Sequence, residues 1–288
     1  MKLVTFYIPV KNGINWIGDA IDSILNQSTS SIDIFIYDDG SDDGTYEYLV
    51  NNYSDKVTLF NNSVSNGPAF ASNFMIDRIT TPYAARLDAD DLCAFDRVQR
   101  QYIYLVQNNL DYCGSFIEEF GSRSRKVTYP TDQESINFAM ISNPPFAHST
   151  LFCKTEILKN YKYNQDCYYC DDYELLYRVV CDTRLSGGVI PKYLVKYRIH
   201  ESQITNLYKL KQLSNANLIR QLNFNFLLVN RFKIDLNYSK IYSPFYLLFK
   251  LLQNEIVNNK NINKYLIKSI FSCFKQYIKR GFLKYKTN

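Results

Sequence analysis

The chain has 288 residues, 46% of them hydrophobic, which is enough for one large α/β domain or for a domain with an appendage. Its charge is divided unevenly, because residues 205–288 carry 15 Lys and Arg against two acids, while residues 1–204 carry 18 against 26. A basic tail behind an acidic body predicts an anionic partner, either a membrane surface or nucleic acid. No apolar run approaches the roughly 18 residues of a spanning helix, and the N-terminal run is too short for a signal peptide, so we expect a cytoplasmic protein.

The seven cysteines are odd in number and scattered, and only Cys167 and Cys170 form a Cys-x-x-Cys pair. A structural zinc site would need a second pair or histidines at a suitable spacing, and the chain has only two histidines. Ordinary thiols in a reducing cytosol are therefore expected.

Apolar runs alternate with amphipathic stretches through the first hundred residues. This alternation predicts parallel βαβ units, and right-handed crossovers then place all strand ends at one edge of the sheet. The expected strands are residues 3–10, 32–37, 57–60 and 83–87, and the expected helices are residues 16–26, 45–52, 69–78 and 94–109. The predicted fold class is α/β and Rossmann-like, with a mostly parallel sheet flanked by helices.

The rest of the chain first extends this pattern and then changes it. Further strands are expected at residues 112–120 and 189–197, a helix at residues 173–180, and three more helices at residues 207–232, 242–258 and 262–285. We therefore expect a domain over residues 1–204, with halves at 1–100 and 101–204, followed by a basic helical C-terminal region at 205–288.

Polar clusters follow three of the expected strands, at residues 9–12, 38–41 and 88–91. In open α/β sheets ligands bind at this edge. Asp88 and Asp90 follow a buried strand, and a divalent cation on a diphosphate would offset the repulsion between their carboxylates. Asp91 is expected to be the N-cap of the helix at residues 94–109.

Asp38 and Asp39 lie in a loop that is too polar for the core. They either cap a turn or accept hydrogen bonds from a nucleoside. A dinucleotide site would require Gly-x-Gly-x-x-Gly after the first strand, where this chain has Pro-Val-Lys-Asn-Gly, so a nicotinamide enzyme is excluded.

Over its first hundred residues the chain resembles the family 2 glycosyltransferases with the GT-A fold, and two shorter matches extend the resemblance to about residue 204. The matching segments occur in the family's order and spacing, at residues 7–12, 20–28, 36–45, 66–73, 86–91, 170–175 and 197–200. The resemblance implies transfer of a sugar from a nucleotide-diphosphate donor, with inversion at the anomeric carbon and with Mn²⁺ or Mg²⁺ as cofactor.

The resemblance also implies which residues bind the donor. Asp39 would hold the base, and Asp88 and Asp90 would form the metal-binding Asp-x-Asp motif, with Asp90 the more direct ligand and His200 a further one. The implied donor-binding set is Pro9, Val10, Asn12, Asp39, Gly67, Asn73, Arg86, Asp88 and Asp90. The chain departs from the family at Lys11, where an aromatic residue is often found, and at Ser72, where arginine is often found.

Inversion by direct displacement needs a base that takes the proton of the acceptor hydroxyl. The resemblance implies Asp172 as this base and Asp171 as the second choice, and adjacent carboxylates can raise one another's pKa, which suits the role. The same acids would also complement the dipole of the helix that follows, and both roles can hold at once. His148 and Arg198 are expected on the acceptor side, with phosphate as an alternative partner of Arg198.

The resemblance therefore implies a metal-dependent inverting glycosyltransferase of bacterial surface polysaccharide or lipid-linked glycan synthesis. The absence of spanning segments and of a Gln-x-x-Arg-Trp pattern favours addition of single sugars to a glycan or lipid-linked acceptor. A sugar nucleotidyltransferase, which has a related fold, and a non-catalytic nucleotide-sugar-binding protein are the alternatives.

Residues 262–285 combine an apolar stripe with interspersed lysines. Such a helix can lie on an anionic membrane at its inner face, or it can pack on the catalytic domain or on a second copy of the chain in a homo-oligomer. Nucleic acid is not expected, because no recognisable reader motif accompanies the basic residues.

Overall fold

The computed structural model describes residues 2–140 and 142–201, together with residues 203, 212, 215, 216, 219 and 220. The helices expected in residues 205–288, and the membrane or self-association surface expected there, lie almost wholly outside the described residues. None of the helices in the described part of the chain has both the length and the apolar character that crossing a membrane requires.

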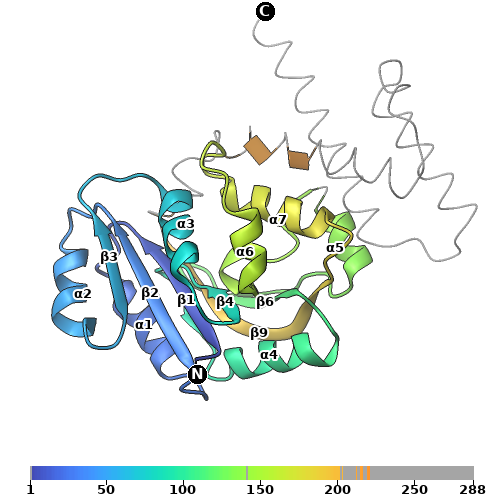
Figure 1. Ribbon diagram of the computed structural model, residues 1–288, viewed down its shortest axis with the longest axis horizontal. Helices are drawn as coiled ribbons and strands as arrows, with labels where there is room; N and C mark the ends of the chain where they lie inside the picture. The colour runs from blue at the N-terminus through green and yellow to red at the C-terminus, as the bar shows by residue number, and fades with distance from the viewer. Residues whose placement is uncertain are drawn as a thin grey trace, which may run out of the picture.

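The first part of the chain alternates strands and helices, as predicted (Figure 1). Its elements are β1 (Val4–Val10), α1 (Ile17–Leu25), β2 (Ile32–Asp39), α2 (Thr45–Tyr53), β3 (Thr58–Asn62), α3 (Pro68–Arg78) and β4 (Tyr83–Arg86). β1 pairs in parallel with both β2 and β4, and β3 pairs in parallel with β2. The predicted parallel units are therefore confirmed, and the polar residues that follow these strands meet at one edge of the sheet.

The second part of the chain makes the sheet mixed. Its elements are β5 (Leu92–Cys93), α4 (Arg97–Gln107), β6 (Tyr112–Gly121), β7 (Arg125–Val127), α5 (Gln133–Ala139), the short 3₁₀ helix η1 (His148–Thr150), β8 (Phe152–Lys154), α6 (Thr155–Tyr161), α7 (Asp171–Cys181) and β9 (Gly187–Ile199). The strand order is β3-β2-β1-β4-β8-β6-β9-β5, with β7 paired to β6. β8 runs antiparallel between β4 and β6, whereas β9 runs parallel to β6.

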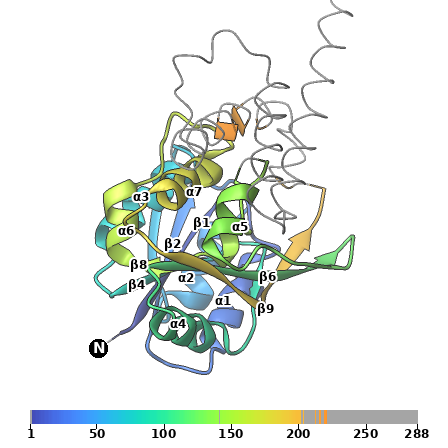
Figure 2. The ribbon, with the colours of Figure 1, turned by 90° about the vertical axis from the view of Figure 1, so that its right-hand side faces the viewer.

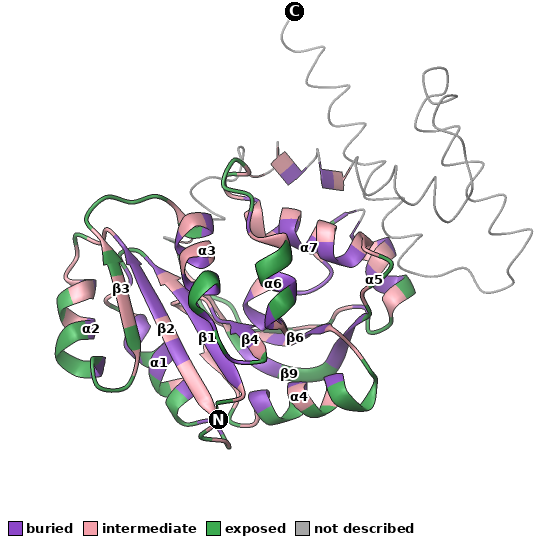
Figure 3. Cartoon of the chain, viewed as in Figure 1, coloured by how far each residue is buried: buried purple, intermediate pink, exposed green. Residues whose placement is uncertain are grey.

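Helices cover both faces of the sheet, because the strands bury side chains in both directions (Figures 1 and 2). Along β1, Phe6 and Ile8 pack into a core with α1, α2 and α4, whereas Tyr7 packs into a second core with α3, α5, α6 and α7. Figure 3 shows β1 and β2 buried along most of their length. The α/β fold class predicted from the sequence is confirmed.

The expected role of Asp91 as a helix N-cap is wrong. The helix begins only at Arg97, with Asp96 at its N-cap position, and residues 92–93 form β5 instead. Asp91 is fully buried, and its Oδ1 accepts a hydrogen bond from the backbone N–H of Arg198 at 2.9 Å. The helix cannot begin directly after Asp91, because the next two residues, Leu92 and Cys93, form β5 and pair antiparallel with β9.

Candidate active site

The turn between β4 and β5 carries the three acids that follow the fourth strand. Asp88 forms an ion pair with Arg86, the last residue of β4, with 2.8 Å between Oδ1 and Nη2. Arg86 is buried, and its Nη1 donates to Oγ of Ser72 at 3.0 Å. Ser72, which departs from the family pattern, thus supports an arginine supplied by β4. Burial alone would raise the pKa of Asp88, but the charge and hydrogen bond of Arg86, together with the charges of His148 and Arg97, outweigh it, so the pKa lies below its ordinary value.

Asp90 is held by a residue 110 positions later in the chain. Its Oδ2 lies 2.8 Å from Nε2 of His200. Burial, followed by the negative charge of Asp88, raises the pKa of Asp90. A cation at this position would oppose the second of these causes, because it would offset the repulsion between the two carboxylates.

The residues at this turn fit a cation that is coordinated partly by the protein and partly by a phosphate group. Among residues 2–140 and 142–201 no group of three or more His, Cys, Asp and Glu side chains is arranged to hold a metal ion by itself. Asp90 and His200 nevertheless present a carboxylate oxygen and an imidazole nitrogen to each other. Mg²⁺ and Mn²⁺ take carboxylate oxygens and are commonly held by one or two carboxylates plus substrate phosphates.

The acid pair lies near the same turn. Asp171 and Asp172 are the first two residues of α7, so they do begin a helix. Burial, followed by the charge of Asp172, raises the pKa of Asp171 to about 7. Burial raises the pKa of Asp172 to about 6, against a lowering hydrogen bond from the backbone of Tyr173. The charges of Asp88 and Arg86 act on both acids, so the pair lies close to the Asp-x-Asp motif.

His148 ends a chain of hydrogen bonds inside the protein. Its Nε2 lies 2.7 Å from Oη of Tyr163, which in turn lies 2.7 Å from Oη of Tyr7. The side chain of Asn73 fixes Tyr163 by bonding both its backbone N–H and its carbonyl, each at 2.8 Å. Burial, followed by the charge of Arg86, lowers the pKa of His148 to about 3, so its imidazole is neutral at physiological pH. Asn73 and His148 thus meet through Tyr163.

The two tyrosines of this chain were not singled out from the sequence. Tyr7 lies in an apolar strand, where it is indistinguishable from an ordinary core aromatic. Tyr163 lies in the segment between α6 and α7, outside any recognised motif. Only the fold shows that the two hydroxyls meet, because 156 residues separate them in the sequence.

Asp39, at the end of β2, has both carboxylate oxygens occupied by the loop before α3. Its Oδ2 accepts from Oγ of Ser65 at 2.6 Å and from the N–H of Gly67 at 2.8 Å, and its Oδ1 accepts from the N–H of Asn66 at 2.8 Å. Gly67 has a φ of +91°, which residues with a Cβ rarely adopt. Asp39 and Gly67, both expected to bind the donor, are therefore also bonded to each other and hold the loop before α3 in place.

Asp38 has a free acceptor at the same edge. Its Oδ1 accepts from the N–H of Ser41 at 3.0 Å, but its buried Oδ2 has no hydrogen-bond partner among the described residues. Buried carboxylate oxygens are normally paired, so a ligand N–H is a fitting partner. Asn12 braces the loop, because its N–H donates to Oγ of Ser41 at 2.9 Å. Pro9 and Val10 lie beside Tyr37 and Asp38 in the β1–β2 register.

Arg198 lies at the end of β9, against the turn that carries the Asp-x-Asp motif. Its Nε donates to the carbonyl of Asp90 at 2.9 Å, and its Nη2 pairs with Oδ2 of Asp19 at 3.0 Å. The side chain is 12% exposed. In this structure the guanidinium thus contacts protein groups on the turn and on α1.

Comparisons with known proteins agree with this geometry. The model of the family described as Glycosyl transferase family 2 matches residues 5–183. An uncharacterized glycosyltransferase of Haemophilus influenzae is 24% identical over 96% of this chain and 91% of its own length. An uncharacterized glycosyltransferase of Rickettsia typhi is 31% identical over 71% of this chain and 66% of its own length. The O-antigen biosynthesis glycosyltransferase WbnJ of Escherichia coli is 25% identical over 69% of this chain and 81% of its own length.

Solved structures share the fold at lower sequence identity. S. aureus TarS 1–349 in complex with UDP has a TM-score of 0.61 at 13% identity, covering 87% of this chain and 78% of that one. Mannosyltransferase PcManGT from Pyrobaculum calidifontis, in complex with GDP-Man and Mn²⁺, has a TM-score of 0.55 at 13% identity, covering 96% of this chain and 86% of that one. The likeness establishes a GT-A-like fold.

Proposed function

The chain belongs to Glycosyl transferase family 2, and from this premise we propose that it is a metal-dependent, inverting glycosyltransferase. The observation that carries the proposal is the partly buried acid pair, Asp171 and Asp172, with pKa values raised to about 7 and about 6. A carboxyl that titrates near neutral pH can accept a proton during a reaction. The charges of Arg86, the last residue of β4, and of Asp88, the first acid of the Asp-x-Asp motif, both act on the pKa values of the pair.

In the proposed reaction Asp172 takes the proton of the acceptor hydroxyl, with Asp171 as its neighbour. The hydroxyl oxygen attacks the anomeric carbon from the face opposite the diphosphate. The bond from that carbon to the phosphate oxygen breaks, and its electron pair leaves with the nucleotide diphosphate. Asp90 and His200 would hold Mn²⁺ or Mg²⁺, which when bound stabilises the charge of the leaving diphosphate. Asp88, kept charged by Arg86, would complete the motif.

The substrate classes rest on the relatives. TarS structures are described with UDP and with UDP-GlcNAc, and the PcManGT structure with GDP-Man and Mn²⁺. WbnJ is named for O-antigen biosynthesis. The proposed donor is accordingly a nucleotide-diphosphate sugar, and the proposed acceptor is a growing glycan or a lipid-linked glycan of the bacterial surface, extended by single sugars.

The proposed place of action is the cytoplasmic side of a membrane. Residues 205–288, with 15 Lys and Arg against two acids, would contact an anionic membrane surface or a second copy of the chain. Residues 1–204 would carry the catalytic domain, with donor binding in residues 1–100 and the acceptor side in residues 101–204.

Thermal unfolding of the full chain with UDP or GDP, with and without Mn²⁺, tests donor binding. We expect one nucleotide to raise the melting temperature further when Mn²⁺ is present than when it is absent, and Asp90→Ala to abolish the metal-dependent part of the rise. Asp77→Ala is the matched control. Asp77 is an acid on α3 whose side chain is 62% exposed, and it pairs with Lys162, which follows α6, and not with a residue of the Asp-x-Asp motif. A wild-type chain that no nucleotide stabilises would contradict the proposed function.

Asp172→Asn separates catalysis from binding in the same experiment. The amide has nearly the shape of the carboxyl but cannot act as a base, so transfer should fall by about 10²–10⁴-fold. Donor-induced stabilisation should be retained, because the diphosphate is held elsewhere. Unimpaired transfer in this variant would refute the assignment of the base, and a wild type that binds donor without any transfer would indicate the non-catalytic alternative.

A further inference from the structure

The last residues of β9 return to the turn that carries the Asp-x-Asp motif. The backbone N–H of Arg198 donates to Oδ1 of Asp91 at 2.9 Å, and its Nε donates to the carbonyl of Asp90 at 2.9 Å. Two residues further on, His200 reaches Oδ2 of Asp90 at 2.8 Å. Residues 198–200 therefore form hydrogen bonds with both the backbone and the side chain of Asp90.

Two aromatic rings also lie against the guanidinium of Arg198. Its central carbon lies 4.4 Å from the ring centre of Trp16 and 4.5 Å from that of Phe120. Its Nη2 pairs with Asp19 on α1 at 3.0 Å. A planar guanidinium can stack on rings and direct N–H groups in its plane at the same time, which an ammonium cannot do. Three separate segments of the chain, the start of α1, the turn after β4 and the end of β6, thus converge on one side chain.

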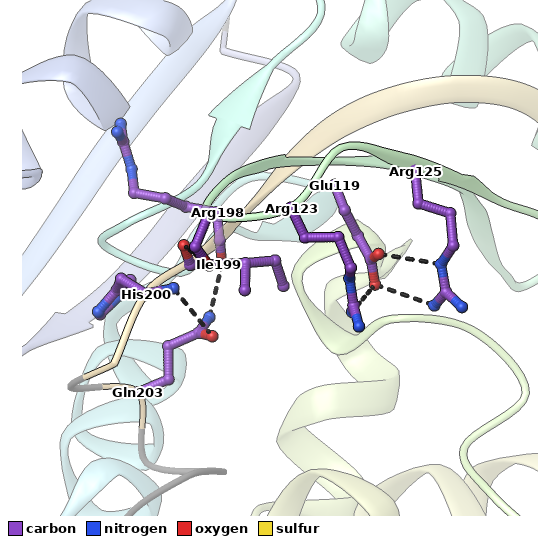
Figure 4. Close-up of polar contacts among 8 residues, drawn as sticks. Glu119, Arg123, Arg125, Arg198, Ile199, His200 and Gln203 are labelled. Carbon is purple, nitrogen blue, oxygen red and sulfur yellow. Dashed lines mark hydrogen bonds and ion pairs between the residues drawn. The ribbon is translucent and has the colours of Figure 1, made fainter.

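Hydrogen bonds also hold the backbone at the end of β9, so the main chain that carries the Arg198 side chain is fixed (Figure 4). Nε2 of Gln203 donates to the carbonyl of Arg198 at 2.6 Å. The N–H and Oγ of Ser122 both donate to the carbonyl of Ile199 at 3.0 Å. Gly121 has a φ of +94°, and a Cβ there would lie 2.6 Å from that same carbonyl oxygen.

Figure 4 also separates Arg198 from the nearby arginines of the β6–β7 hairpin. Arg123 and Arg125 both pair with Glu119, at 2.7 and 3.0 Å, and their side chains are 54% and 57% exposed. The side chain of Arg198 points away from them. The hairpin arginines face solvent, whereas Arg198 is committed to the Asp-x-Asp turn.

We propose that Arg198 is a positioning residue, which holds the backbone of Asp90 so that its carboxylate and the imidazole of His200 converge on the metal cation. This role adds to the acceptor-side or phosphate contact expected from the sequence, because Nε of Arg198 bonds the carbonyl of Asp90 and Nη2 pairs with Asp19. The inference rests on the proposed function, since it concerns the cation of that reaction. Residues that orient metal ligands typically change metal affinity by about 10–100-fold when they are replaced.

Direct Mn²⁺ binding tests this role without any turnover. Free Mn²⁺ is measured by electron paramagnetic resonance in titrations of the full chain with UDP or GDP, whichever binds. In Arg198→Met we expect the Mn²⁺ dissociation constant to rise by about 10–100-fold, while nucleotide affinity without metal stays at the wild-type value. Arg198→Lys should lose as much, because it keeps the charge but not the planar N–H groups.

Arg78→Met is the matched control. Arg78 also stacks on a ring, 3.5 Å from the centre of Phe74, and also donates to a backbone carbonyl, but it lies on α3 away from the turn. Its replacement should leave Mn²⁺ affinity unchanged. Phe120→Leu removes a ring that lies against Arg198 and leaves Trp16, whose ring also contacts that of His200, in place. It provides a second test if Arg198→Met does not fold, and Mn²⁺ affinity should again fall several-fold.

Wild-type Mn²⁺ affinity in folded Arg198→Met or Phe120→Leu would overturn the inference, and so would full rescue in Arg198→Lys. Equal losses in metal-free nucleotide affinity would also overturn it, because they would indicate general disruption of the site. If the wild-type chain itself binds no Mn²⁺ with either nucleotide, the proposed function fails first and this inference fails with it.

Discussion

The carboxylates that end β2 and β4 look alike in the sequence, because each follows a buried parallel strand, but they are held in different ways. Asp39 is fixed by Ser65, Asn66 and Gly67, which lie 26 to 28 residues away within the same βαβ unit. Asp90 is fixed by Arg198 and His200, which lie 108 and 110 residues away. The end of β2, where we propose that the nucleoside binds, is thus completed by residues nearby in the sequence. The end of β4, where we propose that the diphosphate binds, is completed only when β9 is in place.

This difference has an electrostatic side. The oxygens of Asp39 receive three hydrogen bonds and need no further partner. Asp90 shares its surroundings with the charge of Asp88, and together with burial this charge raises its pKa. At the end of β4, where the repulsion between Asp88 and Asp90 remains, a bound cation would therefore stabilise the protein as well as the proposed reaction.

The largest expected effect is the pH dependence of the transfer rate, which we attribute to the acid pair Asp171 and Asp172. The base must be unprotonated, and burial raises the pKa of Asp172 to about 6 and of Asp171 to about 7. At saturating donor and Mn²⁺, the rate should be constant at high pH and should fall by about tenfold per pH unit below the governing pKa. The residual rate of Asp172→Asn should lose this dependence. A flat wild-type profile between pH 5 and 8 would contradict the assignment.

The nucleoside end should respond to Asp39→Asn chiefly in stability. The amide replaces one acceptor oxygen with a donor that faces backbone N–H groups, so the free energy of unfolding should fall by about 1–3 kcal/mol. Urea unfolding without nucleotide measures this change. Mn²⁺ binding, measured at saturating nucleotide, should stay near the wild-type value, because Asp90 is held from β9.

Asp38→Asn is the matched partner of that variant. Oδ2 of Asp38 has no partner among the described residues, so its loss should change the unfolding free energy little. If this oxygen accepts an N–H from the base, nucleotide affinity should fall by about tenfold or more. The reverse outcome, in which Asp39→Asn alone loses nucleotide at unchanged stability, would show that Asp39 holds the base, as the family resemblance implies.

The parts of the fold that could be predicted from the sequence are those in which the pairing strands and helices follow one another closely along the chain. The strands and helices of the first hundred residues follow from apolar period and spacing, and parallel pairing then fixes which strand ends meet. Asp171 and Asp172 at the start of α7 were predicted in the same way. β8 and the antiparallel pairing of β5 were not predicted, because two or three residues carry too little periodicity to indicate a strand.

The contacts that complete the site depend on long-range geometry, which no local pattern encodes. Asp91 has the sequence context of a helix cap, yet pairing of the next two residues with β9 turns it inward. Tyr7 and Tyr163 look like core aromatics, and only the fold brings their hydroxyls together. Arg198 follows a tyrosine in a motif that suggests a ligand contact, whereas its stacking on Trp16 requires α1 and β9 to be adjacent.

The most direct test is a crystal structure of the full chain grown with Mn²⁺ and UDP or GDP, with the metal located by its anomalous scattering. We predict a manganese peak bonded to Asp90 and to oxygens of the diphosphate, at the end of β4 and within reach of His200. A nucleotide bound without manganese at Asp90, or with Asp90 still paired to His200 alone, would contradict the claim that acids distant in sequence meet here to hold the leaving group.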